Sequence, residues 1–155
     1  MRRVDVLART VTAGIAGVLL LTACGARAVS VPAPTPSGVS VAACLRLAPV
    51  LPGEVLGAKA RPTSPDSPYT AAWGDPPITL RCGQKPDVRV ADDAQLITVN
   101  GVAWYPQTLE RGTSFTTIDL VAQVRVEVPS SYSPEAGALP TISDAVKKAV
   151  PALTS

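Results

Sequence analysis

The chain has 155 residues, enough to bury one hydrophobic core, and a formal net charge of +2. It contains no histidine, which excludes the usual general base, the most common zinc ligand and the Ser-His-Asp and Cys-His constellations. The sequence also lacks Gly-x-Ser-x-Gly, Ser-x-x-Lys, phosphate-loop and calcium-loop motifs. We therefore expect a protein without catalytic residues, a metal site or a cofactor.

Residues 1–23 have the pattern of a bacterial lipoprotein signal peptide. Three arginines form a basic start, and the apolar run at 11–21 is shorter than the ~20 residues that a membrane-spanning helix needs. Leu21-Thr22-Ala23-Cys24 is typical of a lipobox, whose cysteine is lipidated and becomes the new N terminus. We expect two or three acyl chains on Cys24 to hold the protein on the extracytoplasmic face of a cell membrane. An ordinary cleaved signal peptide or a short uncleaved anchor is the alternative.

Removal of residues 1–23 takes three basic residues and one acidic residue and leaves a formally neutral chain. The only adjacent cationic pair that follows is Lys147-Lys148, so nucleic-acid binding has no electrostatic basis in the sequence. Residues 24–39 combine the lipidated cysteine with a proline-rich composition that predicts an extended tether. Residues 40–155 are expected to form a single globular domain.

Two cysteines remain once Cys24 is assigned to lipid. Cys44 and Cys82 would then lie in an oxidising compartment, which favours a disulfide between them. Such a bond would close a loop of about 38 residues and contribute about 4 kcal/mol. A thiol nucleophile or a pair of metal ligands is the competing interpretation. It is disfavoured because the two cysteines are far apart in the sequence and histidine is absent.

Residues 40–51 predict a short helix. Ser40 is a good N-cap residue, and Cys44 lies among apolar residues at helical spacing, so this cysteine is expected on the buried face. Two prolines near the end of the segment limit the helix. Residues 52–69 are rich in proline, glycine and serine, and this composition predicts a loop.

The middle of the chain predicts an antiparallel sheet. Residues 78–82 alternate between apolar and polar side chains and predict a strand with its cysteine pointing inward. Residues 96–105 predict a β-hairpin, because Asn100-Gly101 is typical of a type I′ turn. Two further strands are predicted at residues 115–120 and 122–128.

The C-terminal segment has a helical pattern. Thr141-Ile142-Ser143-Asp144 resembles a capping box, apolar residues follow at helical spacing, and Pro151 ends the segment. The order helix, strands, helix predicts an α+β fold. We expect an antiparallel sheet of four to five strands with an N-terminal and a C-terminal helix packed on one face.

Residues 72–83 contain the densest set of candidate recognition residues. Trp73 offers a large apolar surface, Asp75 suits a turn, and Arg81 is expected on the strand face opposite Cys82. These three residues, Trp73, Asp75 and Arg81, form our candidate binding ledge for a ligand or partner. The competing interpretation is structural: Trp73 would fill the core beside the disulfide, and Trp104 is assigned to the core for the same reason.

The same segment carries a family resemblance. The residues that carry it are Trp73 to Gly83, Cys44, Leu51-Pro52, Val99-x-Gly101-Val102-x-Trp104 and Val126-x-Val128-Pro129-x-x-Tyr132. Over about residues 44–151 the sequence resembles the actinobacterial lipoprotein family called domain of unknown function 3515. The resemblance implies a secreted or membrane-anchored envelope protein with paired cysteines, and it implies no catalytic residue, substrate or cofactor.

Three functions are consistent with the sequence. The first is a non-enzymatic envelope lipoprotein that is anchored in the membrane through Cys24 and docks on an envelope protein or on a wall or lipid component. The second is a carrier of a lipid or small hydrophobic ligand, which needs an apolar cavity of about 300 Å³ or more. The third and least favoured is a hydrolase that works without histidine. Its active site would need several of the following aspartates in one pocket: Asp75, Asp92, Asp93 and Asp119.

Overall fold

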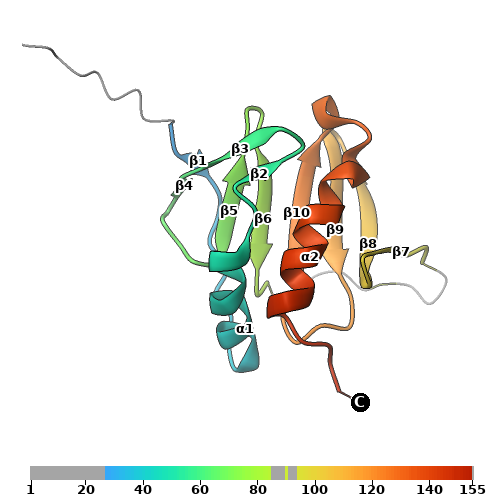
Figure 1. The fold of residues 1–155 in the computed structure, drawn as a ribbon. Helices are drawn as coiled ribbons and strands as arrows, with labels where there is room; N and C mark the ends of the chain where they lie inside the picture. Colours follow the sequence, from blue (N-terminus) through green and yellow to red (C-terminus); the bar gives the residue numbers. More distant parts are fainter. Residues whose placement is uncertain (1–26, 85–89, 91–93, 155) are drawn as a thin grey trace, which may run out of the picture.

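The computed structural model describes residues 27–84, 90 and 94–154 (Figure 1). Within these residues the chain forms an antiparallel sheet of eight strands, in the order β2-β3-β5-β6-β10-β9-β8-β7, and two α-helices. Two further strands form a separate parallel pair. The strands are β1 (Val29–Ser30), β2 (Glu54–Val55), β3 (Ala58–Arg61), β4 (Thr63–Ser64), β5 (Thr70–Trp73), β6 (Ile78–Cys82), β7 (Ile97–Val99), β8 (Val102–Leu109), β9 (Gly112–Thr117) and β10 (Val124–Pro129).

Alternating burial along the central strands gives the sheet two different faces. In β6 the side chains of Ile78, Leu80 and Cys82 are buried, and those of Thr79 and Arg81 point to the opposite side. β10 repeats the pattern, and its register with β6 aligns the buried positions of both strands. We call the side with the buried apolar residues the helix face and the other side the far face.

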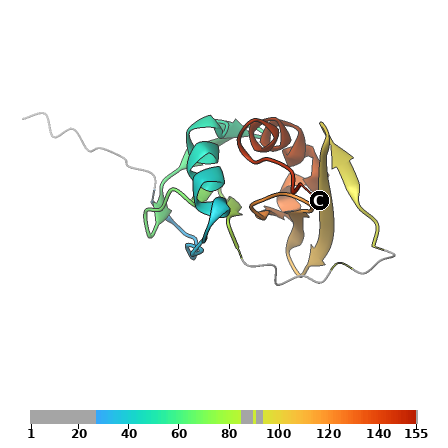
Figure 2. The ribbon, with the colours of Figure 1, turned by 90° about the horizontal axis from the view of Figure 1, so that it is seen from below.

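Two helices cover the helix face. They are α1 (Val39–Leu47), which lies over β5 and β6, and α2 (Leu139–Ala149), which lies over the middle of the sheet (Figures 1 and 2). A disulfide between Cys44 and Cys82 joins α1 to the sheet, as predicted. The predicted apolar stripe of the C-terminal helix is also confirmed, because Ile142, Ala145, Val146 and Ala149 are buried. Short 3-10 turns are η1 (Ala48–Val50), η2 (Ser130–Tyr132) and η3 (Glu135–Ala138).

Large side chains fill the space between the helices and the sheet. Trp104 of β8 is fully buried, and its indole Nε1 donates a hydrogen bond of 3.0 Å to the hydroxyl of Ser143 in α2. This contact satisfies two polar groups that would otherwise be buried without a partner. Other side chains of this layer with less than 2% exposure include Leu47, Trp73, Ile78, Leu80, Val124, Val126, Val128, Leu139, Ile142 and Val146.

Both predicted helix caps are wrong. α1 begins at Val39 after Gly38, and the Ser40 hydroxyl donates to the carbonyl of Val121 at 2.8 Å instead of capping the helix. α2 begins at Leu139, ahead of the predicted capping box, and the Asp144 carboxylate of that box accepts from Asn100 Nδ2 at 2.9 Å. In both cases a tertiary partner has taken the side-chain oxygen that local sequence assigns to the helix end.

The predicted hairpin is confirmed, but the predicted number of strands is wrong. Val99 pairs with Val102 and Ile97 pairs with Trp104, and Asn100 and Gly101 both have positive φ. The additional strands are β2, β3 and β5 in the sheet and the pair β1 and β4 outside it. β2, β3 and β4 lie within residues 52–69, where prolines interrupt strands of only two to four residues and conceal any alternation.

Part of the predicted tether belongs to the domain. β1 pairs with β4 in parallel, and the amides of Val29 and Val31 donate to the carbonyls of Pro62 and Ser64 at 2.8 and 3.1 Å. Val29, Val31 and Ala72 form a small second core on the far face. Residues 29–31 are therefore fixed to β4 and to the far face of β5 and do not extend freely from the domain.

Candidate functional site

The three residues of the candidate binding ledge do not share one surface. Trp73 lies on the helix face with 1% of its surface exposed, and its Nε1 donates to the Pro52 carbonyl at 2.8 Å. Arg81 lies on the far face, paired in register with Thr70 of β5. The structural interpretation of Trp73 is therefore the correct one, and Trp104 is buried as expected.

Asp75 is separated from both of these residues. Its side chain is 87% exposed in the β5–β6 turn, and the nearest cationic atom is Arg61 Nη1 at 3.9 Å. Arg61 makes shorter contacts elsewhere, because its two terminal nitrogens donate to the carbonyls of Gly74 and Arg27 at 2.7 and 2.6 Å. Arg61 therefore ties the N-terminal segment to the turn, and Asp75 is a surface charge.

The predicted alternative of an aspartate cluster finds no support in the described residues. Asp75 lies at the β5–β6 turn, whereas Asp119 follows β9 near the C-terminal segment, where its carbonyl accepts from the amide of Leu153 at 2.8 Å. Asp92 and Asp93 lie outside the described residues, as does Cys24. Among the described residues, histidine, cysteine, aspartate and glutamate do not form a group of three that could hold a metal ion.

Arg81 belongs instead to a charged cluster on the far face. It pairs directly with Arg125 across β6 and β10, an arrangement of like charges that is unfavourable by itself. The Glu127 carboxylate lies between them: Oε1 accepts from Arg81 Nη2 and lies 3.3 Å from Arg125 Nε. Arg81 and Arg125 are only 18% and 15% exposed, whereas the Glu127 side chain between them is 34% exposed.

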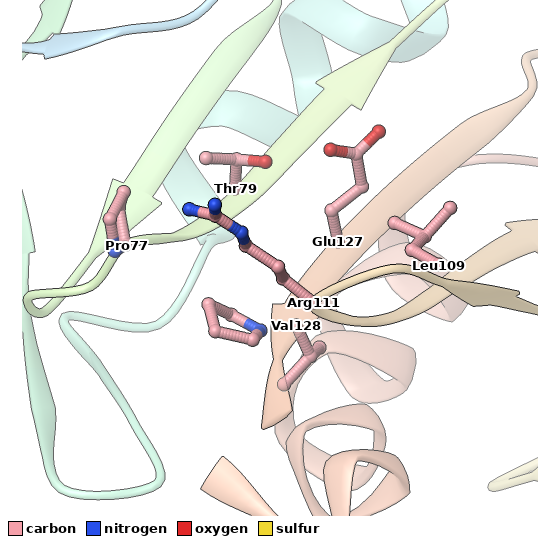
Figure 3. A pocket seen from close by; sticks show the side chains of 7 residues that line it. Pro77, Thr79, Leu109, Arg111, Glu127 and Val128 are labelled. Atoms are coloured by element: carbon pink, nitrogen blue, oxygen red, sulfur yellow. The ribbon is translucent and has the colours of Figure 1, made fainter. Parts of the chain in front are cut away.

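A pocket of about 280 Å³ lies next to this cluster, at one end of the central strands (Figure 3). We call it the strand-end pocket. Four apolar side chains and three polar side chains form it, from β6, β8, β10 and the β5–β6 and β8–β9 turns. Its residues are Pro77, Thr79, Leu109, Arg111, Glu127, Val128 and Pro129.

The backbone around the strand-end pocket is held on both sides. The amide of Ser130 donates to the carbonyl of Arg111 at 3.1 Å. Gly112 has a φ of 147°, and a Cβ there would lie 2.1 Å from a backbone carbonyl oxygen of β10, so only glycine allows this close approach. On the opposite side, the Tyr132 hydroxyl donates to the carbonyl of Pro76 at 3.0 Å. The backbone on both sides of the pocket is therefore fixed, whereas the Arg111 side chain is exposed.

Arg111 is the cation that lines this pocket, and its side chain is exposed. Figure 3 shows its side chain extending from the β8–β9 turn toward Thr79. Within the part of the chain that the structure describes, its guanidinium forms no ion pair and no hydrogen bond. An unpaired guanidinium, a threonine hydroxyl and apolar walls form a donor set that can bind an anion. Thr79 lies directly opposite Glu127 in the register of β6 and β10, and Oε1 of Glu127 contacts Arg81 and Arg125.

Two other hollows are slightly larger but lie at the margins of the fold. One of about 330 Å³ is at the β3–β5 edge between Leu51 and Pro68, and one of about 350 Å³ lies between Ser40 and Leu153. Neither is an apolar chamber between the helices and the sheet, where tryptophan and aliphatic side chains fill the space.

Among the described residues, neither α1 nor α2 has the length and apolar character of a membrane-spanning helix.

Comparison with known proteins gives one match. The model of the family described as "Protein of unknown function (DUF3515)" matches residues 6–154, which is nearly the entire chain. Neither a curated protein nor a solved structure matches this chain. The fold and the site therefore have to be interpreted from their own geometry.

Proposed function

Since the chain belongs to the DUF3515 family, whose description assigns no function, we propose that it is a non-enzymatic recognition protein of the cell envelope. In this proposal residues 1–23 are removed, Cys24 carries the lipid anchor, and the domain faces the extracytoplasmic side of the membrane. The strand-end pocket is the contact site for an envelope partner.

The observation that carries this proposal is that the Arg111 guanidinium has no ion pair or hydrogen bond among the described residues. The β8–β9 turn presents this guanidinium over an apolar pocket, and Oε1 of the neighbouring Glu127 carboxylate already contacts two other arginines. Such a site can hold an anionic group. The donor set supports recognition over catalysis.

The course of the N-terminal segment supports a position close to the membrane. Val29 is fixed to the domain, and only four residues separate it from Cys24. Five extended residue steps span at most about 18 Å. A lipid on Cys24 would therefore keep the domain near the bilayer surface, in place of the long tether that the proline-rich composition predicts. An envelope protein close to the bilayer surface would therefore be within reach of the domain.

The filled space between the helices and the sheet favours docking over the carrier hypothesis. A carrier must enclose the apolar part of its cargo, and known ligand pockets reach ~300–1,000 Å³. Here the interior is occupied by side chains such as Trp73, Trp104 and Leu139, and the strand-end pocket measures only about 280 Å³. The geometry suits a small recognised group better than an acyl chain.

Site-specific photo-cross-linking in cells that express the chain naturally tests this proposal. A photoreactive amino acid at Leu109, which lines the strand-end pocket, should give a discrete cross-linked product, and one at Lys148 on the helix side should not. Arg111→Glu should abolish the Leu109 product, because it reverses the charge of the pocket. Equal products at both positions, or no product at Leu109, would contradict the proposal. Mass spectrometry of the same material should find diacylglycerol on Cys24, and an intact residue 1 would refute the anchor.

A further inference from the structure

We propose that the strand-end pocket binds a small organic carboxylate, in which the carboxylate is attached to a compact apolar group. This inference rests on the proposed recognition function and specifies the ligand chemistry of the same site. Two sources share this chemistry: a free small acid and the C-terminal residue of a peptide with an apolar side chain.

The charge of the pocket favours an anion. Arg111, Arg81 and Arg125 lie in or beside it, and Glu127 is the one acidic residue in its lining. Because the Glu127 carboxylate is engaged by Arg81 and Arg125, the guanidinium of Arg111 is the group that lacks a counter-charge among the described residues. A bound anion would supply it, and a guanidinium matches the two oxygens of a carboxylate.

The number of donors favours a carboxylate over phosphate. The pocket offers the guanidinium of Arg111 and the hydroxyl of Thr79, which suffice for the two oxygens of a carboxylate. A phosphate dianion needs more donors, and its second charge would lie close to the Glu127 carboxylate in the same lining. Like charges within one pocket repel each other, so an anion with a single charge is the better fit.

The apolar walls and the volume define the remainder of the ligand. Pro77, Leu109, Val128 and Pro129 supply most of the lining, so the group attached to the carboxylate should be apolar. A volume of about 280 Å³ corresponds to about nine water molecules at ~30 Å³ each. This space fits a group the size of one amino-acid residue and is too small for the acyl chain of a lipid.

The preformed backbone makes the inference testable with small probes. Arg111 is held through its carbonyl by Ser130, and Gly112 fixes the turn against β10. Because this backbone is already fixed, binding has to order little more than the exposed Arg111 side chain, so even a fragment should bind measurably. N-acetyl-leucine carries one carboxylate and one compact apolar side chain, and N-acetyl-leucinamide is its neutral counterpart.

The experiment is a ligand-observed NMR titration of the mature chain, purified from membranes in a neutral detergent. N-acetyl-leucine should bind to the wild type with a Kd at least about tenfold lower than that of N-acetyl-leucinamide, as expected for a charge-assisted pair. Arg111→Gln should raise the Kd of N-acetyl-leucine by about tenfold and leave that of the amide unchanged. Lys148→Gln, a charge change on exposed α2 surface, is the matched control and should have no effect.

Several results would overturn the inference. They are equal affinities for the acid and the amide, no effect of Arg111→Gln, or tighter binding of inorganic phosphate than of N-acetyl-leucine. If a tetrapeptide ending in leucine binds more tightly than N-acetyl-leucine, the source is a peptide terminus, and if the affinities are equal, it is the free acid. The cross-link at Leu109 tests recognition separately. A cross-link that depends on Arg111, without any carboxylate binding, would refute the ligand class and leave the recognition function standing.

Discussion

Glu127→Gln should destabilise the protein by removing the negative charge between two opposed arginines. Arg81 and Arg125 are direct cross-strand neighbours, and the Glu127 carboxylate contacts both. A hydrogen bond to a charged group contributes ~1.5–3 kcal/mol when it is buried. Because Glu127 is 34% exposed, we expect a total loss of about 2 kcal/mol in the free energy of unfolding after allowing for solvent screening. For a domain of this size the loss corresponds to about 7 °C in Tm.

The effect of a second substitution, Arg81→Gln, on the free energy of unfolding should change sign between the wild type and the Glu127→Gln background. In the wild type, Arg81→Gln removes a partner of Glu127 and should destabilise by about 1 kcal/mol. In the Glu127→Gln background the same change removes one of two like charges and should stabilise by about 0.5 kcal/mol. Glu54→Gln, at an exposed carboxylate of β2 with no ion pair among the described residues, should be neutral.

Urea denaturation followed by tryptophan fluorescence measures these effects, since both tryptophans are buried. The Glu127→Gln deficit should also shrink in 1 M salt, where charges are screened beyond ~3 Å. If Arg81→Gln destabilises the two backgrounds equally, or if Glu127→Gln unfolds at the wild-type urea concentration, the cluster does not act through charge compensation.

The disulfide, the Trp104–Ser143 hydrogen bond and Gly112 provide three other tests of the packing. Cys44→Ala with Cys82→Ala should lower the unfolding free energy by about 4 kcal/mol; a reductant should reproduce the loss in the wild type, and an unchanged urea midpoint would contradict it. Trp104→Phe should cost about 2 kcal/mol by leaving the Ser143 hydroxyl unpaired, and Ser143→Ala in that background should recover part of it; no recovery would refute this explanation. Gly112→Ala should cost about 2 kcal/mol or more in calorimetry and weaken N-acetyl-leucine binding, because its Cβ would meet a carbonyl oxygen at 2.1 Å; wild-type behaviour would show that the turn can relax.

The sequence predicts the parts of the fold that depend on local periodicity. Alternation at residues 78–82 gives the face and the inward cysteine of β6, and Asn100-Gly101 gives the hairpin with its register. The stripe at Ile142, Ala145, Val146 and Ala149 gives the buried face of α2. In each case neighbouring residues carry the whole pattern.

Features that depend on distant pairing were missed. β1 has two residues and exists because it pairs with β4, more than thirty residues later in the chain. Ser40 and Asp144 have good local capping chemistry, but their side chains hydrogen-bond to Val121 and Asn100 instead. Local sequence contains no information about these partners, because the fold brings them together.

The candidate site was predicted only in part for the same reason. Arg81 was correctly placed on the face opposite Cys82, but its partner Glu127 follows from the β6–β10 register. Arg111 was not singled out at all. The signal available was a glycine directly after it, at the start of β9, which is typical of a tight turn with close backbone approach.

The most direct test of the account is the NMR signal of the Arg111 side-chain Nε–H during a titration with N-acetyl-leucine. If the strand-end pocket binds a carboxylate, N-acetyl-leucine should cause a saturable shift of this signal. N-acetyl-leucinamide should not shift it, and the side-chain signals of Arg46 and Arg61 should stay unchanged. If the Arg111 signal does not move, or if the amide moves it equally, the strand-end pocket does not recognise a carboxylate.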